Sequence, residues 1–338
     1  MSNLIATPSK LPSNQFDHFY KGGNRIGKLR NGPGGPMRPE EWIGSTTTRF
    51  GEAVNGLSKL SDGRLLKDAI SADPVSWLGE KHLEKFGNSI EILVKLLDPD
   101  QRLPVHYHPN QSFAKEKLHM NHGKTEAWII LDAPVGAKVG IGFKKQMSKA
   151  EVAALVKAHD SQGLLDSLVF KEVKAGDAVF VPAGVAHAIE SGIFVLELQE
   201  PTDLSILLEW DGFAVDGDKD GHLNLGYETA LDALRFAPLT EAEDKEIVSR
   251  FESSAAKSHP IFKSVADPFF RADYLTGDDK KVEAGFGIFL CLSGEGELVF
   301  ENAGSLGIKA GDAIVVPYSA GTFTVNNCAG ILSRPPAA

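Results

Sequence analysis

Three histidines and one glutamate in this chain have the residue types and spacing of ligands for a divalent metal ion. His106 and His108 lie in the segment PVHYHP, Glu126 lies in GKTEAW, and His187 lies in VPAGVAHAI. Residues two apart on an extended strand point to the same face, so His106 and His108 can act together. The β-branched and aromatic residues around Glu126 and His187 indicate that these ligands come from further strands of a closed sheet.

Three neutral imidazoles and one carboxylate leave a divalent ion with a net positive charge and with positions open for water or a substrate. Zinc is the first candidate, and manganese, iron, cobalt and nickel accept the same ligands. Each residue alone has an ordinary explanation, since His-X-His pairs arise by chance and a glutamate can simply end a strand. Four such residues in separate motifs favour one metal site.

A short unit occurs twice, as VKAGDAVFVP in residues 173–182 and as IKAGDAIVVP in residues 308–317. In each copy Ala-Gly-Asp predicts a turn whose glycine tolerates a positive φ, and the apolar run predicts a buried strand that ends at proline. Two related β-barrels are therefore expected. Thr322 aligns with His187, so we expect the second barrel to bind no metal.

Length, composition and charge limit the class of protein. A chain of 338 residues with 42% hydrophobic content predicts about two globular domains. A net charge of −10 without a basic run argues against nucleic acid and membrane surfaces, so the expected partner is a small molecule; an oligomer is left open. The chain lacks a long apolar stretch and begins with MSNLIATPSK, which predicts a cytoplasmic protein without a signal peptide. Cys291 and Cys328 fit a reducing compartment.

Local patterns predict the elements that position these residues. Residues 1–50 are rich in Gly, Pro and Asn, which predicts irregular coil and short edge strands. The segment GRLLKDAISADPVSWLG predicts a helix that stops or restarts at Pro74, and EILVKLLD predicts the strand that leads into the His-X-His segment. Capping boxes predict two more helices, an insertion at about 148–166 and a later linker; they pair Ser148 with Glu151 and Thr240 with Glu243.

Several blocks along the chain resemble, in order, those of the type I mannose-6-phosphate isomerases of the cupin superfamily, in their short bacterial form. They are EEWIGS, LVKLLDPDQRLPVHYHPN, GKTEAW, GFKKQMSKAEV, VKAGDAVFVPAGVAHAI and LELQEPTD. The resemblance implies a mainly β fold of two jelly-roll (cupin) barrels with a few helices inserted and linking. It implies a metal-binding catalytic barrel with its N-terminal wrap in residues 1–238, and a linker helix with a metal-free barrel in residues 239–338.

The resemblance also implies the chemistry, a metal-dependent interconversion of an aldose and a ketose through a cis-enediol. His108, Glu126 and His187 match the family's ligand positions, while His106 stands where the family usually has glutamine. Lys124 matches a lysine proposed as catalytic in the family, and strand alternation places it on the same face as Glu126. A solvated lysine at the strand entrance is the alternative.

Further residues are candidates for roles around the metal. His122 is a second candidate for proton transfer, although loop histidines are more often inert. Glu197 and Gln199 match the family pattern, and because they alternate with leucines we expect them to line the cavity or support the ligands. Trp42 and Trp128 are candidate walls against a sugar ring, with burial in the core as the alternative.

The chain departs from the family where a phosphate would bind. A family serine is replaced by Pro104, SDTTYR is replaced by TDLSIL, an aspartate-arginine pair by Asp211-Gly212, and RELHIEKAL by LNLGYETAL. Because guanidinium groups and hydroxyls bind phosphate well, an unphosphorylated or altered sugar is an alternative to a sugar phosphate. The arginine that is the family's usual candidate base also has no counterpart here.

Two other functions use the same ligands. An iron or nickel oxygenase of the cupin superfamily holds its metal with three histidines and one glutamate. A sugar-binding module that kept the metal and lost catalysis would account for the missing arginines.

Overall fold

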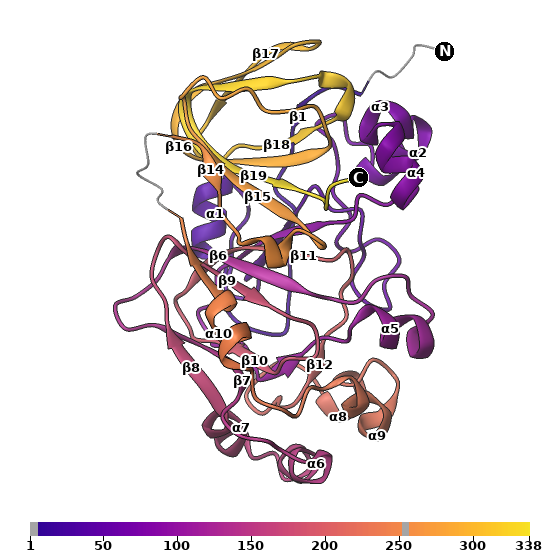
Figure 1. Cartoon of the computed structure of the whole chain (residues 1–338), viewed down its shortest axis with the longest axis vertical. Coiled ribbons are helices and arrows are strands. Elements are labelled where there is room, and N and C mark those ends of the chain that lie inside the picture. The colour runs from indigo at the N-terminus through magenta and orange to yellow at the C-terminus, as the bar shows by residue number, and fades with distance from the viewer. Residues whose placement is uncertain (1–5, 252–256) are drawn as a thin grey trace.

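The computed structural model describes residues 6–251 and 257–338 of a mainly β molecule, and its long axis is vertical in Figure 1. Antiparallel sheets dominate it, which confirms the predicted mainly β class, and the arrangement in two jelly-roll barrels stays a prediction. The expectations for residues 1–5 lie outside the described residues. No helix within the described ranges is both long and apolar enough to cross a lipid bilayer.

Two facing sheets form the part of the molecule that carries the predicted metal ligands. The larger sheet contains, in spatial order, β13 (Val248–Arg250), β9 (Asp177–Val181), β6 (Glu126–Asp132), β11 (Phe194–Gln199), β4 (Leu93–Leu97), β3 (Glu40–Ile43) and β2 (Gln15–Phe16). The smaller sheet contains β12 (Ile206–Leu207), β5 (His106–Tyr107), β10 (His187–Ile189), β7 (Lys138–Phe143) and β8 (Leu168–Glu172). Apolar side chains of both sheets, such as Ile130 and Ile141, share one buried core.

A third sheet lies at the top of Figure 1, in orange and yellow. Its order is β1 (Ser9–Lys10), β18 (Ala313–Val316), β16 (Gly287–Phe300), β19 (Phe323–Arg334), β15 (Arg271–Leu275) and β14 (His259–Pro260), with β17 (Gly304–Lys309) beside β16. One buried cluster joins this sheet to the large sheet, since it contains both Ile288 and Ile129. The division of the chain at residue 239 stays a prediction.

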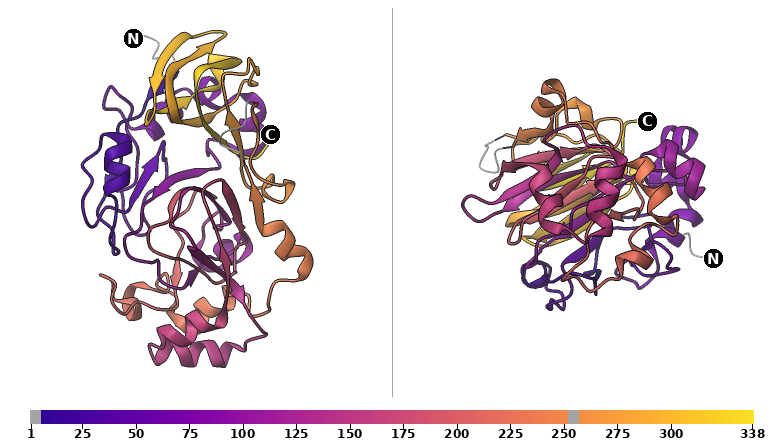
Figure 2. Two further views of the ribbon diagram at one scale, coloured as in Figure 1. Left: turned by 90° about the vertical axis from the view of Figure 1, so that its left-hand side faces the viewer. Right: turned by 90° about the horizontal axis from the view of Figure 1, so that it is seen from below.

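Short helices surround the sheets. They are α1 (Asn24–Arg30), α2 (Leu66–Ala72), α3 (Pro74–Leu78), α4 (Glu80–Phe86), α5 (Gln111–Phe113), α6 (Lys149–Lys157), α7 (Ser161–Ser167), α8 (Gly217–Asp220), α9 (Gly226–Ala230) and α10 (Glu241–Ile247). The predicted restart at Pro74 is confirmed, because α2 ends at Ala72 and α3 begins at Pro74. Both capping boxes are confirmed, at the starts of α6 and α10. Helices α6 and α7 lie at the end of the molecule opposite the third sheet, and the right-hand view of Figure 2 looks onto them.

The prediction of coil and edge strands for the N-terminal region is wrong at α1, which lies on one side of the molecule in Figure 2. Ile26 is fully buried, and the buried Arg30 side chain donates to Oε1 of Glu41 at 2.9 Å. Asn31 ends the helix in a left-handed conformation. Packing and an ion pair with a distant strand stabilise this helix, and local composition predicts neither.

The repeated unit forms the same turn and strand twice, as predicted. The glycines of the two turns, Gly176 and Gly311, have φ of 89° and 90°. In each turn the aspartate side chain, Asp177 or Asp312, accepts a hydrogen bond of 3.0 Å from the backbone N–H three residues earlier. Strands β9 and β18 follow these turns and are buried throughout.

Candidate metal centre and active-site cavity

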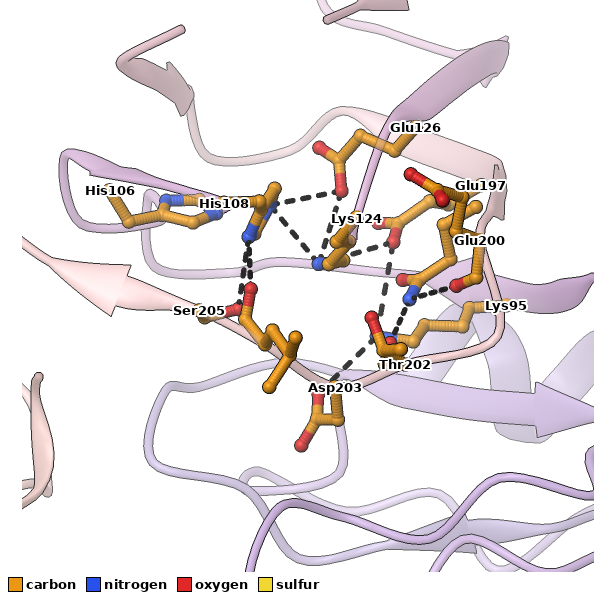
Figure 3. A network of polar contacts seen from close by, with 12 residues as sticks. Lys95, His106, His108, Lys124, Glu126, Glu197, Glu200, Thr202, Asp203 and Ser205 are labelled. Carbon is orange, nitrogen blue, oxygen red and sulfur yellow. Dashed lines mark hydrogen bonds and ion pairs between the residues drawn. The ribbon is translucent and has the colours of Figure 1, made fainter. Parts of the chain in front are cut away.

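The predicted metal ligands meet between the two facing sheets. His106 on β5 and His187 on β10 are direct cross-strand partners, and their Nε2 atoms lie 3.0 Å apart. His108 follows directly after β5, and one nitrogen from each of the three rings lies within 4.8 Å of the others. Glu126 begins β6 in the opposite sheet and places a carboxylate oxygen 3.1 Å from Nε2 of His108. Figure 3 shows His106, His108 and Glu126 around this point.

Backbone carbonyls determine which nitrogen of each ring is free to bind a metal. Nδ1 of each histidine lies 2.8 Å from a carbonyl oxygen, that of Pro104 for His106, of Leu204 for His108 and of Val185 for His187. A carbonyl only accepts hydrogen bonds, so each Nδ1 carries the proton and each Nε2 keeps a lone pair. Three lone pairs and a carboxylate that face one another suit a cation.

The protonation states agree with this donor set. Burial lowers the pKa of His108 and His187 to about 3, and it holds the pKa of His106 well below its usual value, so all three rings are neutral at pH 7. Burial alone would raise the pKa of Glu126, but Lys124 and His108 outweigh it and lower that pKa. Oε2 of Glu126 is buried and accepts no hydrogen bond from the described residues. The residues therefore fit a divalent metal ion.

Lys124 lies directly beside the predicted ligands. Its Nζ atom is 3.1 Å from Nε2 of His108, 3.1 Å from Oε2 of Glu126 and 3.8 Å from Oε1 of Glu197. Its side chain is only 5% exposed, so the alternative of a solvated lysine at the strand entrance is wrong. Burial and the neighbouring charge of Glu126 raise the pKa of Glu197 to about 7. The site thus has a buried ammonium and a carboxyl that can hold a proton near neutral pH.

A second buried lysine, absent from the predicted site, extends this network. Nζ of Lys95 lies 3.5 Å from Glu40, 3.8 Å from Glu197 and 3.9 Å from Asp203 (Figure 3 shows the last two). Glu40 also accepts hydrogen bonds of 2.8 Å from Tyr20 and from Trp42. One signal in the sequence could have identified Lys95, because it is the only charged residue within the apolar strand LVKLL.

Both buried lysines and their carboxylate partners line one cavity of about 560 Å³, a volume typical of small-molecule sites. Of the predicted residues, it is lined by His106, Lys124, Glu126, Trp128 and Glu197. His108 and His187 lie behind this wall, where they contact Glu126. The cavity therefore brings two of the predicted metal ligands, His106 and Glu126, to one surface with Lys124 and Glu197.

Besides His108 and His187, three further predicted residues lie outside the wall of this cavity. His122 pairs with the carboxylate of Glu91 at 2.9 Å and lines other hollows of the surface. Trp42 is fully buried, and the ammonium of Lys95 lies 4.6 Å from the centre of its ring. Gln199 is the cross-strand partner of Glu126, and its amide donates to the carbonyls of Glu200 and Thr202. Gln199 and Trp42 thus support residues of the site from behind.

The fold and the site define a mainly β protein with a cavity between two sheets and, at this cavity, a set of side chains that fits a divalent metal ion. The family model for the catalytic domain of type I phosphomannose isomerase matches residues 38–131. The mannose-6-phosphate isomerase of Streptococcus mutans is 31% identical over 264 residues, which cover 76% of this chain and 78% of that protein. The mannose-6-phosphate isomerase ManA of Bacillus subtilis is 26% identical over 292 residues, which cover 83% and 85%.

Solved structures share the fold. The crystal structure of the mannose 6-phosphate isomerase from Bacillus subtilis has a TM-score of 0.75 at 22% identity, over 97% of this chain and 100% of that one. A mutant of phosphomannose isomerase from Salmonella typhimurium has a TM-score of 0.73 at 15% identity, over 98% and 100%. Because the relative from Streptococcus mutans is 31% identical over 76% of this chain, the chain belongs to the type I mannose-6-phosphate isomerase family.

Proposed function

We propose that this protein is a metal-dependent aldose-ketose isomerase that acts on a mannose- or fructose-type sugar through a cis-enediol. One observation carries the proposal: three Nε2 lone pairs and the carboxylate of Glu126 converge beside the buried ammonium of Lys124, at the wall of a cavity. Family membership favours this reaction over the oxygenase and over the binding module. The cytoplasmic location stays a prediction.

His106, His108, His187 and Glu126 would hold the metal ion, and zinc is our first candidate because neutral imidazoles and a carboxylate suit it. A bound divalent ion would supply Lewis-acid polarisation of a sugar carbonyl. The carbonyl contacts at the Nδ1 atoms keep the rings oriented, and burial keeps them neutral, so the ligand set does not need to rearrange.

Lys124 is the residue that we propose to move the proton between C1 and C2. Lys124 lines the cavity, and its Nζ atom lies 3.1 Å from Nε2 of His108 and from Oε2 of Glu126, so it can reach a sugar bound in the cavity. Glu197 lies 3.8 Å from both Lys124 and Lys95. With a pKa of about 7, Glu197 can take up or release a proton as Lys124 changes its state.

Exchange of the proton at C2 with solvent tests the proposal directly. The purified protein, after elemental analysis of its metal, is incubated in deuterated water with free and phosphorylated mannose, fructose and pentoses. We expect deuterium at C2 and formation of the isomer for at least one sugar, loss of both on chelation, and recovery with zinc. The variant His187→Ala should lose metal and exchange together, whereas His159→Ala, at an exposed histidine outside the cavity, should lose neither.

Two results would contradict the isomerase. Tight binding of a sugar without exchange over the whole panel would indicate a binding module. Oxygen consumption by the iron form, with no turnover by the zinc form, would indicate an oxygenase.

A further inference from the structure

We propose that the cavity takes a sugar without a phosphate group, so that the substrate is a free aldose and its ketose. This inference rests on the proposed isomerase function and names its substrate class. Three features of the cavity carry it: the apolar side chains next to His106, the carboxylates at one edge, and the pairing of every cation that lines it among the described residues.

The wall beside the metal ligands is apolar. Leu207 on β12 is the cross-strand partner of His106, so the two side chains lie on the same face of the sheet. Pro104 precedes His106 by two residues in the same extended segment, and both Pro104 and Leu207 line the cavity. Leu207 ends the segment TDLSIL, and Pro104 lies in the segment PVHYHP. Neither side chain can donate a hydrogen bond to a phosphate.

A later segment adds apolar and acidic residues to the same lining. Leu223 is 4% exposed and lines the cavity. Asp216 and Asp220, at the two ends of the short helix α8, also line the cavity, and both residues are exposed. The backbone N–H of Leu207 donates to the carbonyl of Gly221 directly after α8, so a phosphate beside Leu207 would meet these carboxylates.

Among the residues that the structure describes, three cations line the cavity, and each already has a carboxylate partner. Lys95 is surrounded by Glu40, Glu197 and Asp203 at 3.5 to 3.9 Å. Lys124 contacts Glu126 at 3.1 Å. Arg49, at the rim, pairs with Glu52 at 3.1 Å.

The sum of charges therefore disfavours an anion. Six carboxylates line the described part of the cavity, namely Glu40, Glu126, Glu197, Asp203, Asp216 and Asp220. Three cations and a divalent metal ion balance these carboxylates at best, so a phosphate dianion would enter without compensating positive charge. Ser205 and Asn224 also line the cavity, and they suit the hydroxyl groups of a neutral sugar.

Kinetics with matched substrates tests the inference. We measure kcat/KM for mannose and fructose, and for their 6-phosphates, with the zinc-loaded protein at low and high salt. We expect at least a tenfold preference for the free sugar. Salt should narrow the preference several-fold, because screening weakens the repulsion of the phosphate.

Variants test whether Asp216, Asp220 and Leu207 cause the preference for the free sugar. Asp216→Asn with Asp220→Asn should shift the ratio of kcat/KM toward the phosphorylated sugar by several-fold, and Leu207→Arg should shift it in the same direction. Asp211→Asn is the matched control, because Asp211 is an exposed aspartate that pairs with His159 outside the cavity, and it should leave the ratio unchanged. The double aspartate variant changes exposed side chains only, so it keeps the test valid if Leu207→Arg fails to fold.

The outcomes separate this inference from the isomerase itself. Turnover of the 6-phosphates with equal or higher kcat/KM overturns the inference and leaves the isomerase standing. Turnover of neither class overturns both. A preference for free sugar that none of the variants shifts also overturns it, because the charges of this wall would then not set the specificity.

Discussion

Carbonyl oxygens orient the predicted metal ligands, and one of them is far away in the sequence. The carbonyls of Pro104 and Val185 lie two residues before His106 and His187, whereas the carbonyl of Leu204 holds the Nδ1 proton of His108 from 96 residues away. The spacing of the histidines alone predicted that they share a face, because strand periodicity is local. Lys95 was missed, since a single lysine in a strand acquires its meaning only from carboxylates on other strands.

Lys124→Gln tests the proposed proton carrier. We expect kcat to fall by about 10² to 10⁴-fold, the usual contribution of a positioned acid or base, while the bound metal remains in elemental analysis. Lys144→Gln is the control, because Lys144 is exposed and its ammonium donates to the backbone carbonyl of Asp166. An unchanged kcat in Lys124→Gln would contradict the proposed role.

Strands and helices differ in how far local sequence determined them. The helices with strong caps, α6 and α10, begin where Ser148 and Thr240 predicted, because capping involves residues only three apart. The Ala-Gly-Asp turn also forms in both copies, because its glycine and its aspartate hydrogen bond involve residues at most three apart. Helix α1 was missed, since its stability comes from the burial of Ile26 and the pairing of Arg30 with Glu41.

The two capping boxes should stabilise the folded protein through the hydroxyl groups of Ser148 and Thr240. Ser148→Ala and Thr240→Ala should each lower the free energy of unfolding by about 1 kcal/mol, the typical cost of losing such a cap. Urea denaturation measures this change. Ser71→Ala removes an exposed hydroxyl from within α2, where it donates to the carbonyl of Lys67, and should stay within about 0.5 kcal/mol of the parent. An equal loss in all three variants would show that the caps have no special contribution.

At the scale of the whole molecule, packing between sheets sets the electrostatics of the site. The large sheet carries Glu40, Lys95, Glu126 and Glu197, and the small sheet carries His106 and His187. Because the sheets face each other, these groups are buried and have little contact with water, so their charges act on one another strongly. The raised pKa of Glu197 is a result of this arrangement.

The stability of the metal-free protein should therefore depend on pH. The pKa of Glu197 in the folded state, about 7, lies above its ordinary value of 4.5, so folding favours the protonated form. The stabilisation is complete below about pH 4.5 and is lost as the pH rises through 7; a shift of this size corresponds to roughly 3 kcal/mol. Urea denaturation in the presence of a chelator, from pH 4.5 to 8, measures this loss as the difference between the parent protein and Glu197→Gln, because the three buried histidines, whose pKa values are depressed, destabilise both proteins alike as the pH falls through 6.5.

Glu197→Gln should remove the contribution of Glu197 to the pH dependence of the free energy of unfolding, because glutamine does not titrate. Glu172→Gln, at an exposed glutamate at the end of β8, should leave it as in the parent protein. Identical pH profiles for the parent and Glu197→Gln would show that Glu197 does not titrate in this range.

The sequence by itself determined the candidate metal ligands, the capped helices, the repeated turns and the family, because these depend on periodicity and on motifs a few residues long. Only the tertiary structure decided that Lys95 and Glu40 belong to the site, that His122 lies apart from it, and that Pro104, Leu207 and Leu223 line one cavity with Asp216 and Asp220. These relations join strands and loops far apart in the chain. Their physical basis is the pairing and facing of sheets, which no local pattern specifies.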